Sequence, residues 1–285
     1  MMEHRAEFKR MVLRLPQSKE DYAAVALTAQ LAELLGLDLV ATFIEDTSLA
    51  AIAGLPCVRE FRPFDGGWRP IETAQLAREI EQTIGIARRL FQEAVGTSRV
   101  EASFTLARGS MAEAVGSLAT AGDIIVIIEP KHPAERVTQQ FSRLVDAALR
   151  AASAVMIVPH RILRTAGPIV AVASAQEDPS ILAAIGIAAA AKEAVIILGM
   201  LDPRACSQIS ELAEAAGVQV KFVPVLLQPM DATALAAGLS HLNERLVVIS
   251  RGIFDDRVPP KVASVRGIPV LVVEPDRDGE IRAGR

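Results

Sequence analysis

Cysteine is scarce in this chain of 285 residues, with only Cys57 and Cys206, one in each half. A disulfide-stapled fold needs several cysteines and a secreted context. The first residues, MMEHRAEFKRM, contain no apolar signal-peptide core, and no apolar run approaches the ~20 residues that cross a bilayer. These absences predict a soluble cytoplasmic protein with free thiols and no membrane insertion.

An excess of positive charge is also missing. Lys+Arg number 30 against 34 Asp+Glu, and neither half of the chain has the basic bias that phosphate-dominated nucleic-acid binding needs. Hydrophobic residues make up 51% of the chain, enough to bury a sizeable core. The composition therefore excludes intrinsic disorder and a nucleic-acid partner, and the length favours two domains over one.

The chain lacks the glycine motifs and catalytic groups that would identify an enzyme. No GxGxxG follows an expected strand, and GxxxxGK[ST] and GxSxG are absent. The histidines are scattered, and none has metal-ligand spacing with cysteine or carboxylate: His4, His132, His160 and His241. We therefore expect no enzyme, no metal site and no cofactor, although a Ser-His-Asp arrangement assembled by the fold stays open.

What the chain does contain is a regular alternation of β-branched runs and helical periods, which is typical of βαβ units with a parallel sheet. Strands are expected at 11–15, 39–44, 100–106, 123–128 and 154–159, then at 168–173, 194–199, 218–225, 246–250 and 269–275. The second half thus repeats the first. An internal duplication explains this better than one ten-stranded sheet. The prediction is two tandem doubly wound α/β domains, residues 1–163 and 164–285, each with a five-stranded parallel sheet.

Ligands of doubly wound sheets bind where the strands end, so the loops after strands carry the candidate ligand-binding residues. Ser110 beside Gly109 opens a helix and could bind an anion through free backbone N–H groups. With Glu113, however, Ser110 also forms an ordinary capping box. Ser18 fits a helix cap better than a nucleophile. His132 could line a crevice, but a solvated loop histidine is the favoured interpretation.

The connection from residue 47 to 71 is unusual, because loops of this length in compact domains are commonly functional or disordered. It concentrates aromatic and arginine side chains, the types enriched in interface hot spots, at Arg59, Phe61, Arg62, Phe64 and Trp68. Its prolines and glycines disfavour a helix or a central strand. We expect a contact surface for a second copy of the chain or another protein; the alternative is a satellite core packed on its own domain.

Four segments of the chain are distinctive: FTLARGSMAEAV, LATAGDIIVII, AVMIVPH and GIPVLVVEP. With the order of elements, they resemble the universal stress protein family in its tandem two-domain form, over roughly Lys9 to His160 and Gly167 to Pro275. The resemblance implies an adenine-nucleotide-binding type of fold, with dimers formed through the last strands and, in many members, ATP at the strand ends. We therefore expect strands 154–158 and 269–273 to lie side by side, as in a pseudo-dimer.

The motif that holds ATP in such proteins is degenerate here. The family carries G-x2-G-x9-G-[S/T] after the fourth strand, and Ile128, Lys131 and Phe141 stand at its glycine positions, leaving only the hydroxyl of Ser142. Side chains there block the approach of backbone N–H groups to phosphates. The expected function is a non-catalytic, stress-linked binding or regulatory protein without ATP. The alternative is a nucleotide or small-anion binder that uses Ser18, Gly109, Ser110, His132 and Ser142.

Overall fold

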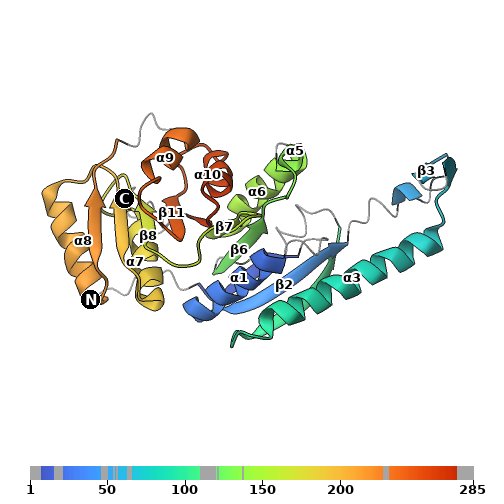
Figure 1. Cartoon of the computed structure of the whole chain (residues 1–285), viewed down its shortest axis with the longest axis horizontal. Coiled ribbons are helices and arrows are strands. Elements are labelled where there is room, and N and C mark those ends of the chain that lie inside the picture. Colours follow the sequence, from blue (N-terminus) through green and yellow to red (C-terminus); the bar gives the residue numbers. More distant parts are fainter. Residues whose placement is uncertain are drawn as a thin grey trace, which may run out of the picture.

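The computed structural model describes one continuous mixed sheet covered by helices on both faces (Figure 1). The ten strands follow the order β10-β9-β8-β11-β12-β7-β6-β1-β2-β5. The residues that the structure describes are 8–15, 22–45, 51–53, 55, 57–62, 66–109, 120, 122–136, 138–226 and 231–274.

The first half of the chain contributes one block of five neighbouring strands, all parallel. Its strands are β1 (Arg10–Arg14), β2 (Asp38–Glu45), β5 (Ala102–Arg108), β6 (Asp123–Ile128) and β7 (Ala154–Val158). Its helices within the described residues are α1 (Tyr22–Leu35), α3 (Thr73–Val95), α5 (Pro133–Arg136) and α6 (Gln139–Ala151).

The second half contributes the other five strands, again all parallel to one another. They are β8 (Ile169–Val172), β9 (Val195–Leu198), β10 (Val220–Val223), β11 (Leu246–Ser250) and β12 (Val270–Val273). The helices are α7 (Pro179–Ala191), α8 (Pro203–Ala215), α9 (Ala232–Gly238) and α10 (Val258–Arg266). All ten strands expected from the sequence are thereby confirmed.

The two blocks meet through their closing strands. β7 and β12 pair antiparallel, with Val155 opposite Val272 and Ile157 opposite Val270. The prediction that these strands lie next to each other is confirmed, but the preference against one ten-stranded sheet is wrong. An unpaired edge strand leaves a row of unsatisfied N–H and C=O groups. Pairing β7 with β12 satisfies these groups on both strands and joins the two five-stranded blocks into a single sheet.

The hydrophobic core is also continuous across both halves. One cluster on the first face of the sheet holds residues of α1, α3, α7 and α8, and the cluster on the other face holds residues of α6, α9 and α10. The central strands, such as Asp123–Ile128 and Leu246–Ser250, are buried throughout. Apolar runs without alternation are what a parallel sheet covered on both faces requires.

Aspartates fix the starts of the helices in the second half. The side chains of Asp178, Asp202 and Asp231 each accept hydrogen bonds from backbone N–H groups of the first turn. The first two are followed by proline, which has no N–H to satisfy and a backbone angle suited to a helix start. These aspartates therefore cap α7, α8 and α9, and α9 ends at Gly238.

α10 forms in a segment that contains two consecutive prolines. The helix begins at Val258, and its first turn contains Pro259 and Pro260. A double proline indicates a loop when seen in isolation, yet proline is tolerated in the first helical turn because those N–H groups have no partner within the helix.

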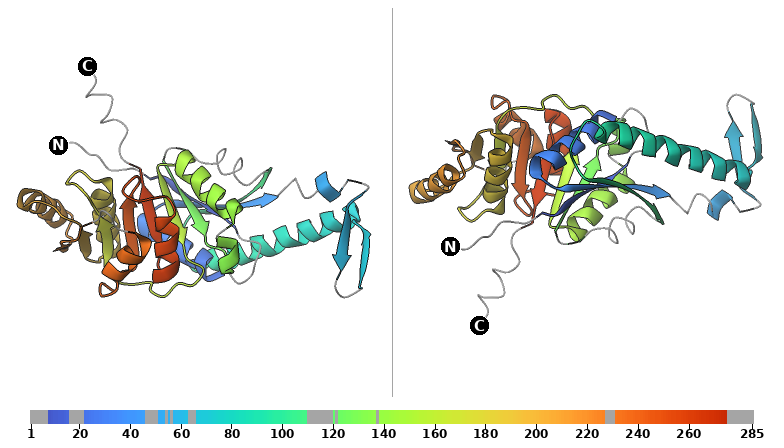
Figure 2. Two further views of the ribbon diagram at one scale, coloured as in Figure 1. Left: turned by 90° about the horizontal axis from the view of Figure 1, so that it is seen from above. Right: turned by 90° about the horizontal axis from the view of Figure 1, so that it is seen from below.

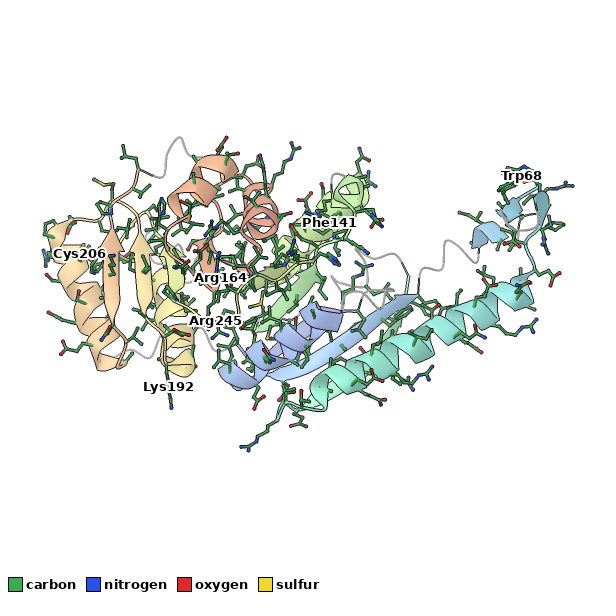
Figure 3. All side chains as sticks on the ribbon, viewed as in Figure 1. Trp68, Phe141, Arg164, Lys192, Cys206 and Arg245 are labelled. Atoms are coloured by element: carbon green, nitrogen blue, oxygen red, sulfur yellow. The ribbon has the colours of Figure 1, made fainter. Side chains whose placement is uncertain are left out.

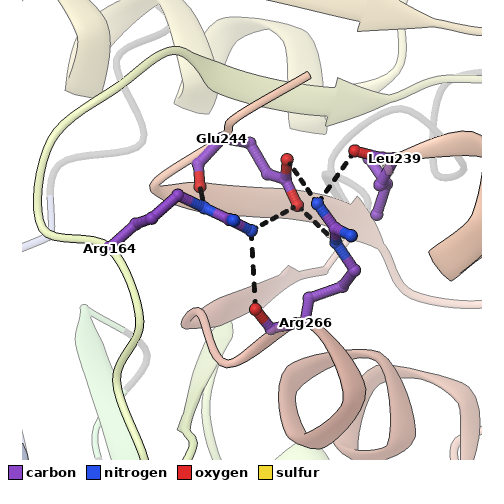
Figure 4. Close-up of polar contacts among 4 residues, drawn as sticks. All are labelled: Arg164, Leu239, Glu244 and Arg266. Atoms are coloured by element: carbon purple, nitrogen blue, oxygen red, sulfur yellow. Dashed lines mark hydrogen bonds and ion pairs between the residues drawn. The ribbon is translucent and has the colours of Figure 1, made fainter. Parts of the chain in front are cut away.

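The segment between the two halves is held against the second half by a buried carboxylate (Figure 4). Glu244 is fully buried and binds Arg266 through Nε at 2.8 Å, while Arg164 lies with Nη2 at 3.4 Å from the same carboxylate oxygen. Arg164 also donates to the Glu244 backbone carbonyl at 2.9 Å. Gly167 passes so close to the Asn243 carbonyl that a Cβ would overlap it.

A second buried carboxylate lies at the opposite edge of the strands. Arg10 holds Asp123 through two hydrogen bonds of 2.8 and 2.9 Å that join the starts of β1 and β6. Burial acts to raise the pKa of Asp123, but the hydrogen bonds from Arg10 and from the Thr120 backbone outweigh it and hold that pKa below its usual value.

One segment leaves the layered body. α3 runs outward from the sheet, and its N-terminal end carries the antiparallel hairpin of β3 (Arg59–Arg62) and β4 (Gly67–Pro70), which every view places beyond the main sheet (Figures 1 and 2). The fully buried residues of α3 all lie in its inner half: Ala87, Phe91 and Ala94. We call the described residues between 51 and 84 the arm.

Among the described residues, no helix combines the length and apolar character that crossing a membrane demands. Cys57 is exposed and Cys206 is partly buried, and neither forms a disulfide.

Candidate functional site

Two places in the sheet have the topology of a ligand crevice, because strand order switches there. In the first half the crevice lies between the carboxyl ends of β1 and β6, and in the second half between those of β8 and β11.

Glu129 is the first residue after β6, and it is buried. Its backbone N–H donates to the Val158 carbonyl at 2.9 Å, and only 2% of the residue is exposed. Burial raises the pKa of Glu129 to about 7, and the Arg136 charge and a hydrogen bond with the Ser264 side chain only partly oppose that rise. Within the part of the chain that the structure describes, its Oε2 has no hydrogen-bond partner.

Arg136 ties the loop after β6 onto itself and onto the other half. Its Nε donates to the Pro130 carbonyl at 2.8 Å and its Nη2 to the Lys131 carbonyl at 3.1 Å. Its Nη1 donates to the Ser264 hydroxyl of α10. In ATP-binding relatives a glycine loop after this strand would approach the phosphates. Here the same segment contains the short helix α5, and the Arg136 guanidinium binds the carbonyl groups that precede it.

The start of α6 is likewise occupied by its own cap. The Thr138 side chain accepts a hydrogen bond from the Phe141 backbone N–H, and Phe141 is buried in the core below the sheet. Figure 3 labels Phe141 on this part of the first half. The Phe141 side chain therefore packs in the core, at a position where the ATP-binding motif of the universal stress protein family has glycine.

The predicted ligand-binding residues that the structure describes, Gly109, His132 and Ser142, do not gather at one point. Ser142 and His132 are exposed beside the exit of β6. Gly109 follows the edge strand β5, which is separated from β6 by β2 and β1, or ~14 Å at the usual strand spacing. Ser18 and Ser110 lie outside the described residues, so their assignment stays a prediction.

The crevice of the second half is filled by the protein's own polar groups. The Asp178 carboxylate accepts hydrogen bonds from the Ser180 N–H at 3.1 Å, from the Ser180 hydroxyl at 2.7 Å and from the Ser250 hydroxyl. Its other oxygen accepts from the Ser174 N–H at 3.1 Å. Asp178, Ser180 and Ser250 are all buried.

The tip of the arm exposes aromatic side chains, and Figure 3 labels Trp68 there. Phe61 and Trp68 stand opposite each other in the hairpin, with ring centroids 5.4 Å apart, and are 50% and 66% exposed. The alternative of a satellite core packed on its own domain is therefore wrong for these two rings. Phe64 and the Arg62 side chain lie outside what the structure describes, and Arg59 is exposed.

The arm also corrects the description of residues 47–71 as a plain connection. Residues 59–62 and 67–70 form a two-stranded sheet that is separate from the main sheet. Proline and glycine at its ends are compatible with this, because an isolated hairpin has only edge strands.

Solved structures share this architecture. A universal stress protein from Archaeoglobus fulgidus matches with a TM-score of 0.63 and 13% identity, covering 96% of this chain and 100% of that one. A functionally unknown protein from Pseudomonas aeruginosa matches with a TM-score of 0.51 and 13% identity, covering 95% and 94%. No protein-family model and no curated protein matches the sequence. The chain has the fold of the universal stress proteins.

Proposed function

We propose that this chain is a non-catalytic, stress-linked binding or regulatory protein of the universal stress protein type, cytoplasmic, and that it works through the arm without binding ATP. The observation that carries the proposal is the contrast between the two kinds of candidate site. The strand-end crevice of the second half is filled by a buried Asp178–Ser180–Ser250 network. The tip of the arm leaves two large aromatic rings in solvent.

We also propose that the two halves are tandem domains packed as a pseudo-dimer. Equivalent bonds support this: the N–H of Glu129, after β6, donates to the Val158 carbonyl, and the N–H of Arg251, after β11, donates to the Val273 carbonyl. Each residue also reaches the last helix of the other half. Arg251 Nη1 donates to the Leu149 carbonyl of α6, and the Glu129 side chain bonds with Ser264 of α10.

Substitution of the exposed tryptophan tests the role of the arm. Trp68→Ala should leave the melting temperature nearly unchanged, because mutations of exposed side chains outside the core are usually within ~0.5 kcal/mol. The buried Phe91, 3% exposed on the same helix that carries the hairpin, is the matched control. Phe91→Ala should cost ~3–5 kcal/mol. Thermal melting of both variants decides; a large drop for Trp68→Ala would show that the ring serves folding.

Affinity capture from the native cytoplasm then tests the function itself. The wild-type chain should retain a partner, or further copies of itself, that Trp68→Ala loses at equal folding. Retention of the same proteins by both chains would contradict a functional contact through the arm.

A second candidate, a nucleotide or small-anion binder, has one observation in its favour. The unpartnered Oε2 of Glu129 lies at the exit of β6 and could accept a hydrogen bond from a ligand hydroxyl or amino group. A thermal-shift series with nucleotides and inorganic phosphate separates the two candidates. A ligand at 100 times its dissociation constant should stabilise the chain by ~2.7 kcal/mol, whereas our proposal predicts no shift.

A further inference from the structure

The exposed side chains of the hairpin are sorted onto two faces. Phe61 is paired with Trp68, and Arg59 is paired with Pro70. Because alternate residues of a strand point to opposite faces, these four side chains share one face. Both rings on this aromatic face are at least half exposed, and Ile52 and Leu55 of the same arm are exposed by 50% and 51%. The tip is therefore a small, largely uncovered apolar surface.

The outer half of α3 continues this surface. Leu76 and Ile80 stand one turn apart and are only partly buried, so they form a short apolar stripe on the outer half of α3, whereas Ile84 packs against the chain's own core. Glu72, which precedes the helix, and Glu79, which accepts a hydrogen bond from Gln75, are exposed along one side of that stripe. An apolar stripe edged by charges at this spacing is the arrangement by which helices pair with an outside element.

The area involved shows that the tip alone is too small for a stable contact. Large side chains can bury ~150–250 Å² each when they are aromatic. The half to two-thirds exposed side chains of Phe61, Trp68, Ile52 and Leu55 therefore offer roughly 400 Å² together. A stable interface needs about 800 Å² from each partner. The stripe of α3 must therefore be covered together with the tip, which requires an occupant as long as the arm itself.

The charges indicate what that occupant is. Arg59 is the one charged residue on the aromatic face of the hairpin, because Glu60, Arg62 and Arg69 lie on the other face. The adjoining part of α3 carries Glu72, Glu79 and Glu81 against Arg78. Two arms laid antiparallel place Arg59 of each on the acidic helix of the other. In a two-fold interface every contact occurs twice, so one complementary pair of surfaces is sufficient.

We propose that the arm pairs antiparallel with the arm of a second copy of this chain, the aromatic face of each hairpin lying on the Leu76–Ile80 stripe of the other. This inference rests on the proposed role of the arm as a contact surface and names its occupant. This association between two chains is separate from the pairing of β7 with β12 within one chain. In the strand order of the first half, β7 lies at one end and β5 at the other.

Sedimentation velocity of the full chain tests the pairing through a charge swap. Arg59→Glu and Glu79→Arg should each weaken the dimer at least tenfold at low salt, because each homodimer then opposes like charges twice. Mixing the two variants should restore a dimer, since both contacts of the mixed pair again join opposite charges. Lys221→Glu, the same charge reversal on the distant strand β10, is the control and should change nothing.

Trp68 gives an independent signal because it is the chain's single tryptophan. Its emission should shift to the blue as the protein concentration rises through the dimer transition. Self-pairing would be overturned by a wild-type chain that stays monomeric at about 100 μM. It would also be overturned by a dimer whose affinity is the same for the wild-type chain, for each charge variant and for their mixture. A blue shift that appears only with anionic phospholipid vesicles would overturn it in favour of a membrane surface. Partner capture lost in Trp68→Ala would still uphold the proposed function after either result.

Discussion

Glu129→Gln should stabilise the chain at about pH 8 by up to ~3 kcal/mol and leave its stability near pH 4.5 almost unchanged. Folding raises the pKa of Glu129 from 4.5 to about 7, so between these values the folded state binds more protons than the unfolded state. The wild-type chain therefore loses stability as the pH rises through that window. A neutral amide of the same shape removes the loss, because it never has to carry a buried charge.

Urea denaturation at a series of pH values measures this difference. The comparison is restricted to pH above 4.5, since the lowered pKa of Asp123 adds an opposite, acid-side loss below its unfolded value. Glu135→Gln, on the exposed face of α5, is the control and should keep the wild-type slope. If Glu129→Gln kept that slope as well, the buried carboxyl would not be the titrating group.

Glu244→Ala should destabilise the second half by about 3–5 kcal/mol, the usual cost of removing one member of a buried ion pair. The substitution deprives two arginines, Arg164 and Arg266, of their shared carboxylate, and both are mostly buried, with side chains 27% and 14% exposed (Figure 4). The segment that joins the halves should loosen as well, because Arg164 belongs to it. Hydrogen exchange of residues 160–167 should therefore accelerate.

An exposed ion pair provides the matched comparison. Glu45 binds Arg108 at 3.0 Å, but the Arg108 side chain is 73% exposed. Glu45→Ala should cost less than about 1 kcal/mol, as surface pairs do. Equal losses for the two variants in thermal melting would show that Glu244 does not fasten the connecting segment.

The sheet could be predicted from the sequence because its strands are buried on both faces. The runs Asp123–Ile128 and Leu246–Ser250 are buried throughout and apolar except for Asp123 and Ser250 at their ends, which is a strong local signal. The helix starts at Asp178 and Asp202 could also be predicted, because an aspartate directly before a proline is a local sequence signal for the N-terminus of a helix.

The missed features depend on contacts between distant residues or on short exposed strands. Glu129 looks like a solvated loop carboxylate until α10 brings Ser264 against it, 135 residues later in the chain. The hairpin of the arm has four-residue strands, and the exposed β4 shows no buried alternation to recognise. Its aromatic and arginine content indicated a contact surface, but the outward course of α3 could not be read from periodicity alone.

Titration calorimetry of the full chain with Mg-ATP is the most direct test of the claim that this protein works without nucleotide at its strand ends. The account predicts only heats of dilution at micromolar protein, because Phe141 and the capped start of α6 take the place of a glycine loop in the first half. In the second half the Asp178 network fills the crevice. A saturable isotherm with a dissociation constant below about 10 μM, whose free energy of ~7 kcal/mol requires a formed site, would contradict it.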